Sequence, residues 1–223
     1  MDILKRSLAP VTDEAWNEID DQAVEVLKNQ LTGRKFVSTV EPQGWDYSAI
    51  PEGRLSIKED SPEKVRYGVR EVTPLVETRV SFELNIWELD NVSRGAEDVD
   101  LAPLEDAAAE AAQFEEDVIY NGLEEAGIDG LVPSAETAID LPEGSGGILE
   151  AASEAVTLFQ EEAIEGPYSL IVGKELWQSI ARTSKGYPLK RQLEDLIGGS
   201  IIYSPQADDP LFVSDQDEDL QLV

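Results

Sequence analysis

The sequence predicts an α+β fold, and three patterns support this prediction. Apolar residues recur at steps of three and four over residues 12–32 and 103–126, which is typical of amphipathic helices. Apolar and polar residues alternate over 64–70 and 75–89, as they do in strands with one exposed face. After about residue 130, shorter helical and strand patterns follow one another. With 41% hydrophobic residues, the 223-residue chain can build a packed core.

The first predicted helix follows Pro10, with Thr12 or Asp13 as its N-cap and Gly33 as its end. Its apolar stripe comprises Trp16, Ile19, Ala23, Leu27 and Leu31. Such a stripe has to be buried, either in the chain's own core or against another chain.

A hairpin is expected next. Strand-like runs at 54–58 and 64–70 flank a polar tip, and Pro51 with Gly53 predicts a turn before them. This hairpin has too little apolar content to be stable alone. A long strand is then expected over 75–89, with a tryptophan on its otherwise polar face.

The first half is expected to end with a long helix over 103–126, and a second set of elements follows it. Helices are then expected at 148–162, 174–182 and 188–197, and strands at 168–172, 201–203 and 211–213. A hairpin turn is expected between 211–214 and 220–223. These elements indicate a compact α/β module.

Composition excludes several function classes. The chain has no His and no Cys, so it has no Ser-His-Asp triad, thiol nucleophile, disulfide or zinc-thiolate site. The net charge of −30 argues against partners such as nucleic acid or an anionic membrane surface. No apolar run approaches a membrane span, and the N-terminus does not resemble a signal peptide, so a cytoplasmic protein is expected.

The same charge suggests a halophilic source. Concentrated salt screens self-repulsion, because the Debye length falls to about 3 Å at 1 M. An ordinary acidic protein is the alternative interpretation.

No motif predicts catalysis or a metal site. Gly144–Gly147 precedes a helix but lacks the spacing of a phosphate-binding loop. Asp215, Asp217 and Asp219 mimic the start of a calcium loop whose glycine is missing, so a hairpin turn is favoured there. Glu115, Glu116 and Asp117 are better interpreted as a solvated or subunit-facing charge run than as metal ligands. Ser169 and Ser200 have no candidate base near them.

Several segments together resemble the encapsulins, the linocin-like shell proteins related to the major capsid proteins of tailed phages. The matching stretches are Leu4–Pro10 with Trp16, Gly33–Val37, Gly44-Trp45, Phe82–Asn91 with Arg94-Gly95, Phe114–Ile119, Glu165–Ile171 and Tyr187–Leu189. Each stretch is short, but they occur in family order over nearly the whole chain.

The resemblance implies an α+β phage major-capsid-like fold with a peripheral domain, an axial domain and an extended loop. It implies an N-terminal arm and lumen-facing helix over 1–40, a peripheral domain over 41–130 that includes the extended loop 51–71, and an axial domain over 131–223. Further peripheral-domain strands are expected beyond Val223.

The implied function is that of a structural subunit. Identical copies are expected to assemble into a closed icosahedral shell, a cytoplasmic encapsulin nanocompartment, with no enzymatic activity of their own. The expected cargo is a ferritin-like protein, which implies iron storage, or a dye-decolorising peroxidase, docked through its C-terminal targeting peptide. A phage or provirus capsid protein is the first alternative, and a hydrolase or peptidase is a weaker one.

The resemblance also assigns candidate site residues. Cargo-peptide docking is expected at Leu27, Leu31, Arg34 and Ser38, although Leu27 and Leu31 also suit a core. The loop Thr183, Ser184, Lys185, Gly186 and Tyr187 is expected to line a five-fold pore. No cofactor is required, but some encapsulins bind flavin, and here Arg79, Trp87 and Asp90 are the candidate contacts. Subunit packing is the other role expected of Trp87.

Overall fold

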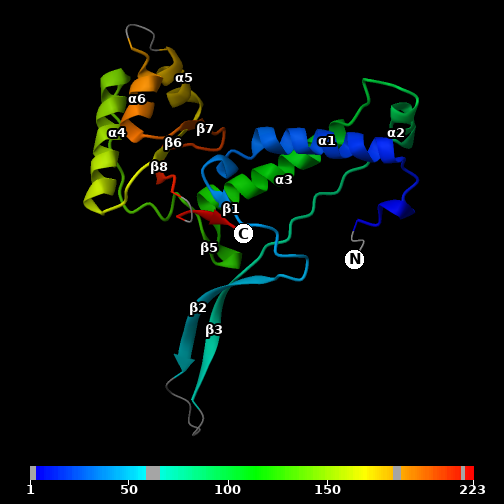
Figure 1. Cartoon of the computed structure of the whole chain (residues 1–223), viewed down its shortest axis with the longest axis horizontal. Coiled ribbons are helices and arrows are strands. Elements are labelled where there is room, and N and C mark those ends of the chain that lie inside the picture. Colours follow the sequence, from blue (N-terminus) through cyan, green and yellow to red (C-terminus); the bar gives the residue numbers. More distant parts are fainter. Residues whose placement is uncertain (1–3, 59–65, 183–186, 217–218) are drawn as a thin grey trace. The chain divides into compact units, whose positions relative to one another are not determined.

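The computed structural model describes residues 4–58, 66–182, 187–216 and 219–223. The chain forms two compact units (Figure 1). Unit 1 comprises Met1–Leu31 with Thr78–Glu116, and unit 2 comprises Thr32–Glu77 with Asp117–Val223. The two units are defined by which residues contact one another. The predicted domain boundaries after 40 and 130 instead come from the resemblance to encapsulins. Those boundaries stay a prediction.

Unit 1 is helical. It contains the 3-10 turn η1 (Arg6–Leu8), α1 (Asp13–Gln30), α2 (Ile86–Ser93) and most of α3 (Ala102–Asn121). Thr12 is the N-cap of α1, since its side-chain oxygen accepts the backbone N–H of Ala15 at 3.3 Å. The core of unit 1 consists of Ala15, Ile19, Leu89, Leu101 and Leu104. The helix predicted over 12–32 is therefore confirmed.

The strand predicted over 75–89 is wrong. Strand β3 ends at Pro74, residues 75–85 have no regular structure, and α2 follows. Asn85 caps α2 by accepting the backbone N–H of Trp87 at 3.0 Å, and Leu89 is buried in the core of unit 1. Alternation alone cannot maintain a strand, because a strand needs a partner to satisfy its backbone groups.

Unit 2 is centred on a three-stranded sheet with the order β7-β6-β8. The fully buried β6 (Tyr168–Val172) pairs in parallel with β7 (Ile201–Tyr203) and antiparallel with β8 (Leu211–Ser214). With α4 (Gly144–Glu161), α5 (Lys174–Arg182) and α6 (Leu189–Ile197), it forms what we call the sheet module (Figure 1). All of these elements match the predicted α/β module.

The two faces of this sheet are buried differently. Tyr168, Leu170 and Val172 of β6 pack against apolar residues of the three helices, including Ile148, Ile180 and Leu193. Ile171 belongs to the opposite face, with Phe36, Val37, Tyr120, Ile202, Ala207 and Val213. Because side chains alternate along a strand, one five-residue strand supports both clusters.

The long helix α3 ends earlier than predicted. It stops at Asn121, and β4 (Gly122–Leu123), the 3-10 turn η3 (Glu124–Ala126) and β5 (Ile128–Asp129) follow. Gly122 has φ +81° and lies so close to β5 that a Cβ there would be 2.5 Å from the carbonyl oxygen of Ile128. The tight β4–β5 pairing therefore ends the helix at a position that only glycine can occupy.

The expected hairpin between 211–214 and 220–223 is also wrong. After the 3-10 turn η2 (Gly33–Lys35), β1 (Ser38–Thr39) pairs in parallel with β9 (Gln221–Leu222). Leu220 and Leu222 pack against the cluster that contains Phe36 and Val37. Pairing with a distant segment thus replaced the expected pairing between these two neighbouring strands.

The predicted hairpin is present as β2 (Ala49–Lys58) and β3 (Tyr67–Pro74), which we call the arm. The strands form an antiparallel ribbon of two strands (Figure 1). The turn predicted at Pro51 and Gly53 is instead an irregularity in register between Pro51 and Leu55. The predicted tip, 59–63, lies outside the described residues.

Candidate functional site

The arm exposes apolar side chains on both faces. Cross-strand partners share a face, and Leu55 is opposite Arg70 while Ile57 is opposite Gly68. Leu55 is 57% exposed and Ile57 is 65% exposed. On the other face, Tyr67 and Val69 are each 55% exposed. No third strand pairs with the arm among the described residues, so a single chain leaves two apolar surfaces and two strand edges in water.

The predicted docking residues fall in different units. Leu27 and Leu31 are half-buried at the end of α1 in unit 1, which fits both the docking and the core interpretation. Arg34 is exposed in η2, and Ser38 is half-buried in β1, both in unit 2. The backbone N–H of Ser38 bonds the carbonyl oxygen of Leu220 at 2.9 Å. The four-residue docking site stays a prediction.

Of the predicted pore loop, only Tyr187 belongs to the described residues; Thr183, Ser184, Lys185 and Gly186 lie outside them. The Tyr187 hydroxyl donates to Oδ2 of Asp195 at 2.7 Å, and its carbonyl oxygen accepts from Nε2 of Gln192 at 2.7 Å. The bond to the Asp195 carboxylate raises the pKa of Tyr187 above its ordinary value. Two bonds thus attach the end of this loop to α6.

The flavin candidates are arranged differently from the prediction. Arg79 and Trp87 do not share a strand face, because Arg79 lies in the irregular segment and Trp87 lies in α2. Trp87 is 68% exposed, and Asp90 follows one helical turn later, where its carboxylate bonds Arg94 at 3.3 Å. An exposed indole is available for stacking, but the prediction that Arg79 and Trp87 lie on one strand face is wrong.

Two polar side chains, Ser169 and Glu116, are buried in a way that the sequence did not predict. Ser169 is fully buried, and its hydroxyl donates to Oδ2 of Asp215 at 3.0 Å, so the statement that it has no nearby base is wrong. The sequence distance of 46 residues hid this pair. Glu116 is fully buried in α3, so the solvated interpretation of 115–117 is wrong at that position. We find no group of three possible metal-ligating side chains among the described residues.

The glycine-rich segment is not a loop. Helix α4 starts at Gly144, so Gly144–Gly147 forms its first turn. A Cβ on Gly147 would lie 2.3 Å from the carbonyl oxygen of Pro142. Close packing against the preceding chain therefore explains the glycine at position 147.

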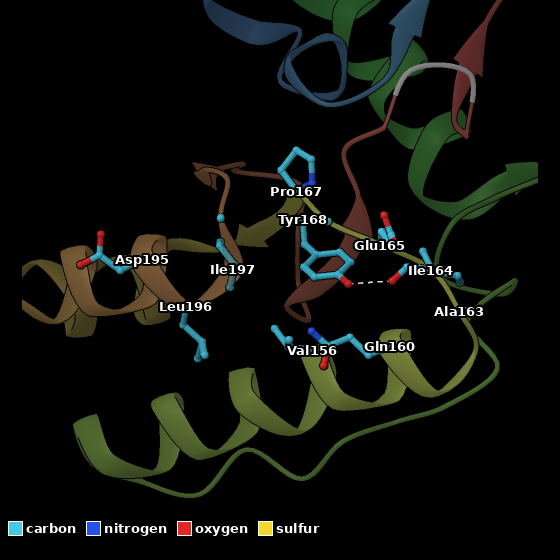
Figure 2. Close-up of a pocket in the computed structure, with 12 residues that line it drawn as sticks. Val156, Gln160, Ala163, Ile164, Glu165, Pro167, Tyr168, Asp195, Leu196 and Ile197 are labelled. Carbon is cyan, nitrogen blue, oxygen red and sulfur yellow. Dashed lines mark hydrogen bonds between the residues drawn. The ribbon is translucent and has the colours of Figure 1, made fainter.

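The sheet module contains a cavity of about 820 Å³ that no pattern in the sequence predicts (Figure 2). It lies between the last turns of α4 and α6 and the loop that joins α4 to β6. The Tyr168 hydroxyl bonds the carbonyl oxygen of Ile164 at 2.7 Å beside it. Asp195 lines this cavity and also holds Tyr187.

No described helix combines the length and the hydropathy that crossing a membrane requires.

Comparisons with known proteins agree on one family. The family model Linocin_M18, described as "Encapsulating protein for peroxidase", matches residues 1–223. Type 1 encapsulin shell proteins of Mycolicibacterium paratuberculosis and Mycobacterium tuberculosis are each 34% identical to the chain, over all of it and 85% of their own length. The corresponding protein of Brevibacterium linens is 32% identical, with the same coverage.

A solved structure supports the fold. The virus-like particle from Pyrococcus furiosus matches with a TM-score of 0.62 and 15% identity, over 90% of this chain and 79% of that one. The chain therefore belongs to the Linocin_M18 family of encapsulating proteins, as a structural shell subunit with the expected α+β phage-capsid-like fold and not as an enzyme.

Proposed function

We propose that the chain assembles into a closed icosahedral shell that encloses a cargo enzyme in the cytoplasm. The observation that carries this proposal is the arm, whose exposed Leu55, Ile57, Tyr67 and Val69 have no cover in a single chain. A neighbouring copy supplies that cover by packing on the ribbon. Enclosure then keeps the cargo at high effective concentration and excludes macromolecules.

Assembly is tested on the purified chain in about 1 M KCl, where charge repulsion is screened. Sedimentation velocity and negative-stain microscopy are expected to show hollow particles of uniform size. A chain that stays monomeric at every salt concentration contradicts the proposal.

The cargo is proposed to be a ferritin-like protein or a dye-decolorising peroxidase, docked by its C-terminal peptide at Leu27, Leu31, Arg34 and Ser38. Two half-buried leucines and a guanidinium suit an amphipathic peptide tail. The family description, which names a peroxidase, supports the second candidate.

Docking is tested by co-expression of the chain with each candidate cargo, with and without its C-terminal peptide. Loading is expected to need the peptide and to fall with Leu27→Ala and Arg34→Gln. Lys28→Ala, on an exposed residue of the same helix, is the control that is expected to load normally. If cargo loads equally well without its peptide and with either substitution, the proposed docking site is contradicted.

Residues 183–187 are proposed to line a pore that admits small ions, with Tyr187 attaching the loop to α6. An acidic surround favours cations, and Lys185 opposes them. In shells loaded with a ferritin-like cargo, Lys185→Glu is expected to speed ferrous iron uptake, whereas Lys28→Glu is expected to leave it unchanged. Equal uptake by both variants and the wild type contradicts the pore assignment.

Flavin binding at Trp87, with Arg79 and Asp90 nearby in sequence, is a separate proposal. It rests on the exposed indole, on which an isoalloxazine can stack. Particles incubated with flavin and then desalted are expected to retain visible flavin absorbance, and Trp87→Ala is expected to lose it. Desalted wild-type particles without that absorbance contradict the proposal.

A further inference from the structure

The cavity in the sheet module has the size of a small-molecule site (Figure 2). Its volume of about 820 Å³ falls within the ~300–1,000 Å³ that ligand pockets typically span. Three of its lining residues are buried, with Val156 at 9% exposure, Tyr168 at 3% and Ile197 at 2%. The exposed Ile164 and Leu196 add apolar surface at its edge. The cavity can therefore cover the apolar body of a small organic molecule.

The charged residues that line this cavity are acidic. Asp195 comes from α6 and Glu165 from the loop before β6, and Figure 2 shows them on either side of Tyr168. Among the described residues, no Lys or Arg lines the cavity. The Glu165 carboxylate forms no hydrogen bond or ion pair within the described part of the chain, and Asp195 uses only Oδ2, to hold Tyr187. Oxygen acceptors thus remain available at two separate places.

Two helix ends add to this negative charge. The last turns of α4 and α6 both lie at the cavity. The C-terminal end of a helix carries a partial negative charge, which a Lys or Arg in the last turn commonly offsets. Neither helix has a basic residue there. The charge around the cavity is therefore complementary to a cation.

The lining favours an organic cation over a metal ion. A metal ion needs several ligands to replace its water shell, and no group of three possible metal-ligating side chains occurs among the described residues. An alkylammonium group needs only one or two acceptors, and its methylene chain can pack on apolar surface. Charged groups at both ends of an apolar chain match two carboxylates on either side of a buried tyrosine ring.

We propose that this cavity binds an aliphatic polyamine, with its ammonium groups on Glu165 and Asp195 and its methylene groups over the apolar lining. All lining residues belong to unit 2 of one chain, so the proposal does not require assembly. A polyamine bound here also lies beside the carboxylate that holds Tyr187, at the end of the predicted pore loop.

Binding is tested by equilibrium dialysis of the purified protein against spermidine, a triamine, in about 1 M KCl. At this salt concentration the Debye length is about 3 Å, so general attraction to the net charge of −30 is screened while direct contacts persist. The protein is expected to take up one spermidine per chain at saturation. An uncharged aliphatic diol of similar length, dialysed in the same way, is expected not to bind.

Two substitutions at the cavity are expected to weaken this binding. Glu165→Gln removes one acceptor charge and should raise the dissociation constant about fivefold, the effect of one exposed ion pair. Leu196→Arg puts a guanidinium at the edge of the cavity, where it repels the amine, and should raise the dissociation constant at least about tenfold. Asp195 is left unchanged, because it also holds Tyr187.

The controls make the same changes of charge at exposed positions of α4. Glu154→Gln matches Glu165→Gln, and Ser153→Arg matches Leu196→Arg. Neither control position lines the cavity, and both are exposed. Both control variants are expected to bind spermidine like the wild type. Circular dichroism verifies that all four variants fold.

Three results overturn the proposal: no uptake of spermidine by the wild type, equal uptake of the diol, or cavity and control variants that bind spermidine alike. The last result would identify a general attraction to the acidic surface. Sedimentation velocity of the same samples reports the assembly state separately. Failure of this site therefore leaves the shell proposal standing, and a chain that stays monomeric leaves this site standing.

Discussion

The sheet module contains a mixed three-stranded sheet and the arm is an antiparallel ribbon, and the two differ in what covers them. In β6 every residue is buried, with helices against one face and the Phe36 cluster against the other. In β3 no residue is fully buried, and most are exposed. The sheet module is therefore stabilised within its own chain, whereas the proposed function gives the arm its stabilising contacts from a neighbouring copy. In a shell subunit, stability and assembly can thus be altered separately.

The largest stability effect is expected in the sheet module. Leu193 is 0% exposed, so Leu193→Ala removes buried methyl groups and leaves a cavity, at a cost of about 2–5 kcal/mol in the free energy of unfolding. Urea unfolding followed by tryptophan fluorescence measures this loss. Leu196→Ala is the control on the same helix, where a 37% exposed side chain is expected to cost less than about 1 kcal/mol. Equal losses of unfolding free energy for Leu193→Ala and Leu196→Ala would contradict the conclusion that buried packing stabilises the sheet module.

The arm is expected to respond in the opposite way. Leu55→Ser with Ile57→Ser removes exposed apolar groups, so the free energy of unfolding of the single chain should change by less than about 0.5 kcal/mol. Particle formation, followed by sedimentation velocity, should be lost. Ser56→Ala, on the other face of the same strand, should assemble normally. If the double variant unfolds, the arm contributes to the fold of its own chain as the sheet module does.

Salt should distinguish the two regions further. Raising KCl from about 0.1 to 1 M shortens the Debye length from about 10 to 3 Å, which weakens repulsion among the carboxylates of 95–173. The melting temperature of the chain is expected to rise by several degrees. A variant with Gln at 150, 154 and 161 should show a smaller rise, because part of the repulsion is already gone. A flat response in the wild type would remove the halophilic interpretation.

The smallest effect is expected at the N-terminus. Both terminal nitrogens of Arg6 bond Asp20 at 2.7 Å, and the guanidinium lies 4.8 Å from the Trp16 ring centre. The bonds from Arg6 lower the pKa of Asp20 below its ordinary value.

A lowered pKa stabilises the fold at neutral pH, and this contribution disappears as the pH falls through the pKa of Asp20 in the folded chain. Asp20→Asn should therefore melt slightly below the wild type at pH 7, and the gap should close in acid. Melting curves of both proteins over this pH range measure the gap. A difference in melting temperature that stays constant with pH would mean that the ionised Asp20 carboxylate does not cause it.

The sequence predicted elements whose signals are local. Helix α1, the arm and the helices of the sheet module were recognised because their periodicity, caps and turns lie within each segment. Family resemblance then supplied the architecture, since seven short stretches in order specify more than any one of them.

The errors share a physical cause. The segment 75–85 alternates like a strand but finds no partner among the described residues, and β9 pairs with β1 at the other end of the chain. The Ser169–Asp215 bond and the burial of Glu116 likewise depend on tertiary packing. Such contacts are set by three-dimensional proximity, which periodicity does not encode.

The β1–β9 pairing also bears on biosynthesis. Phe36 and Val37 leave the ribosome early, but their cluster includes Val213 and Leu222, which are translated long after them. Contacts so distant in sequence form late, because a long loop must close before they are made. A polypeptide whose synthesis stops before residue 211 lacks these partners, so Phe36 and Val37 stay exposed to chaperones and proteases.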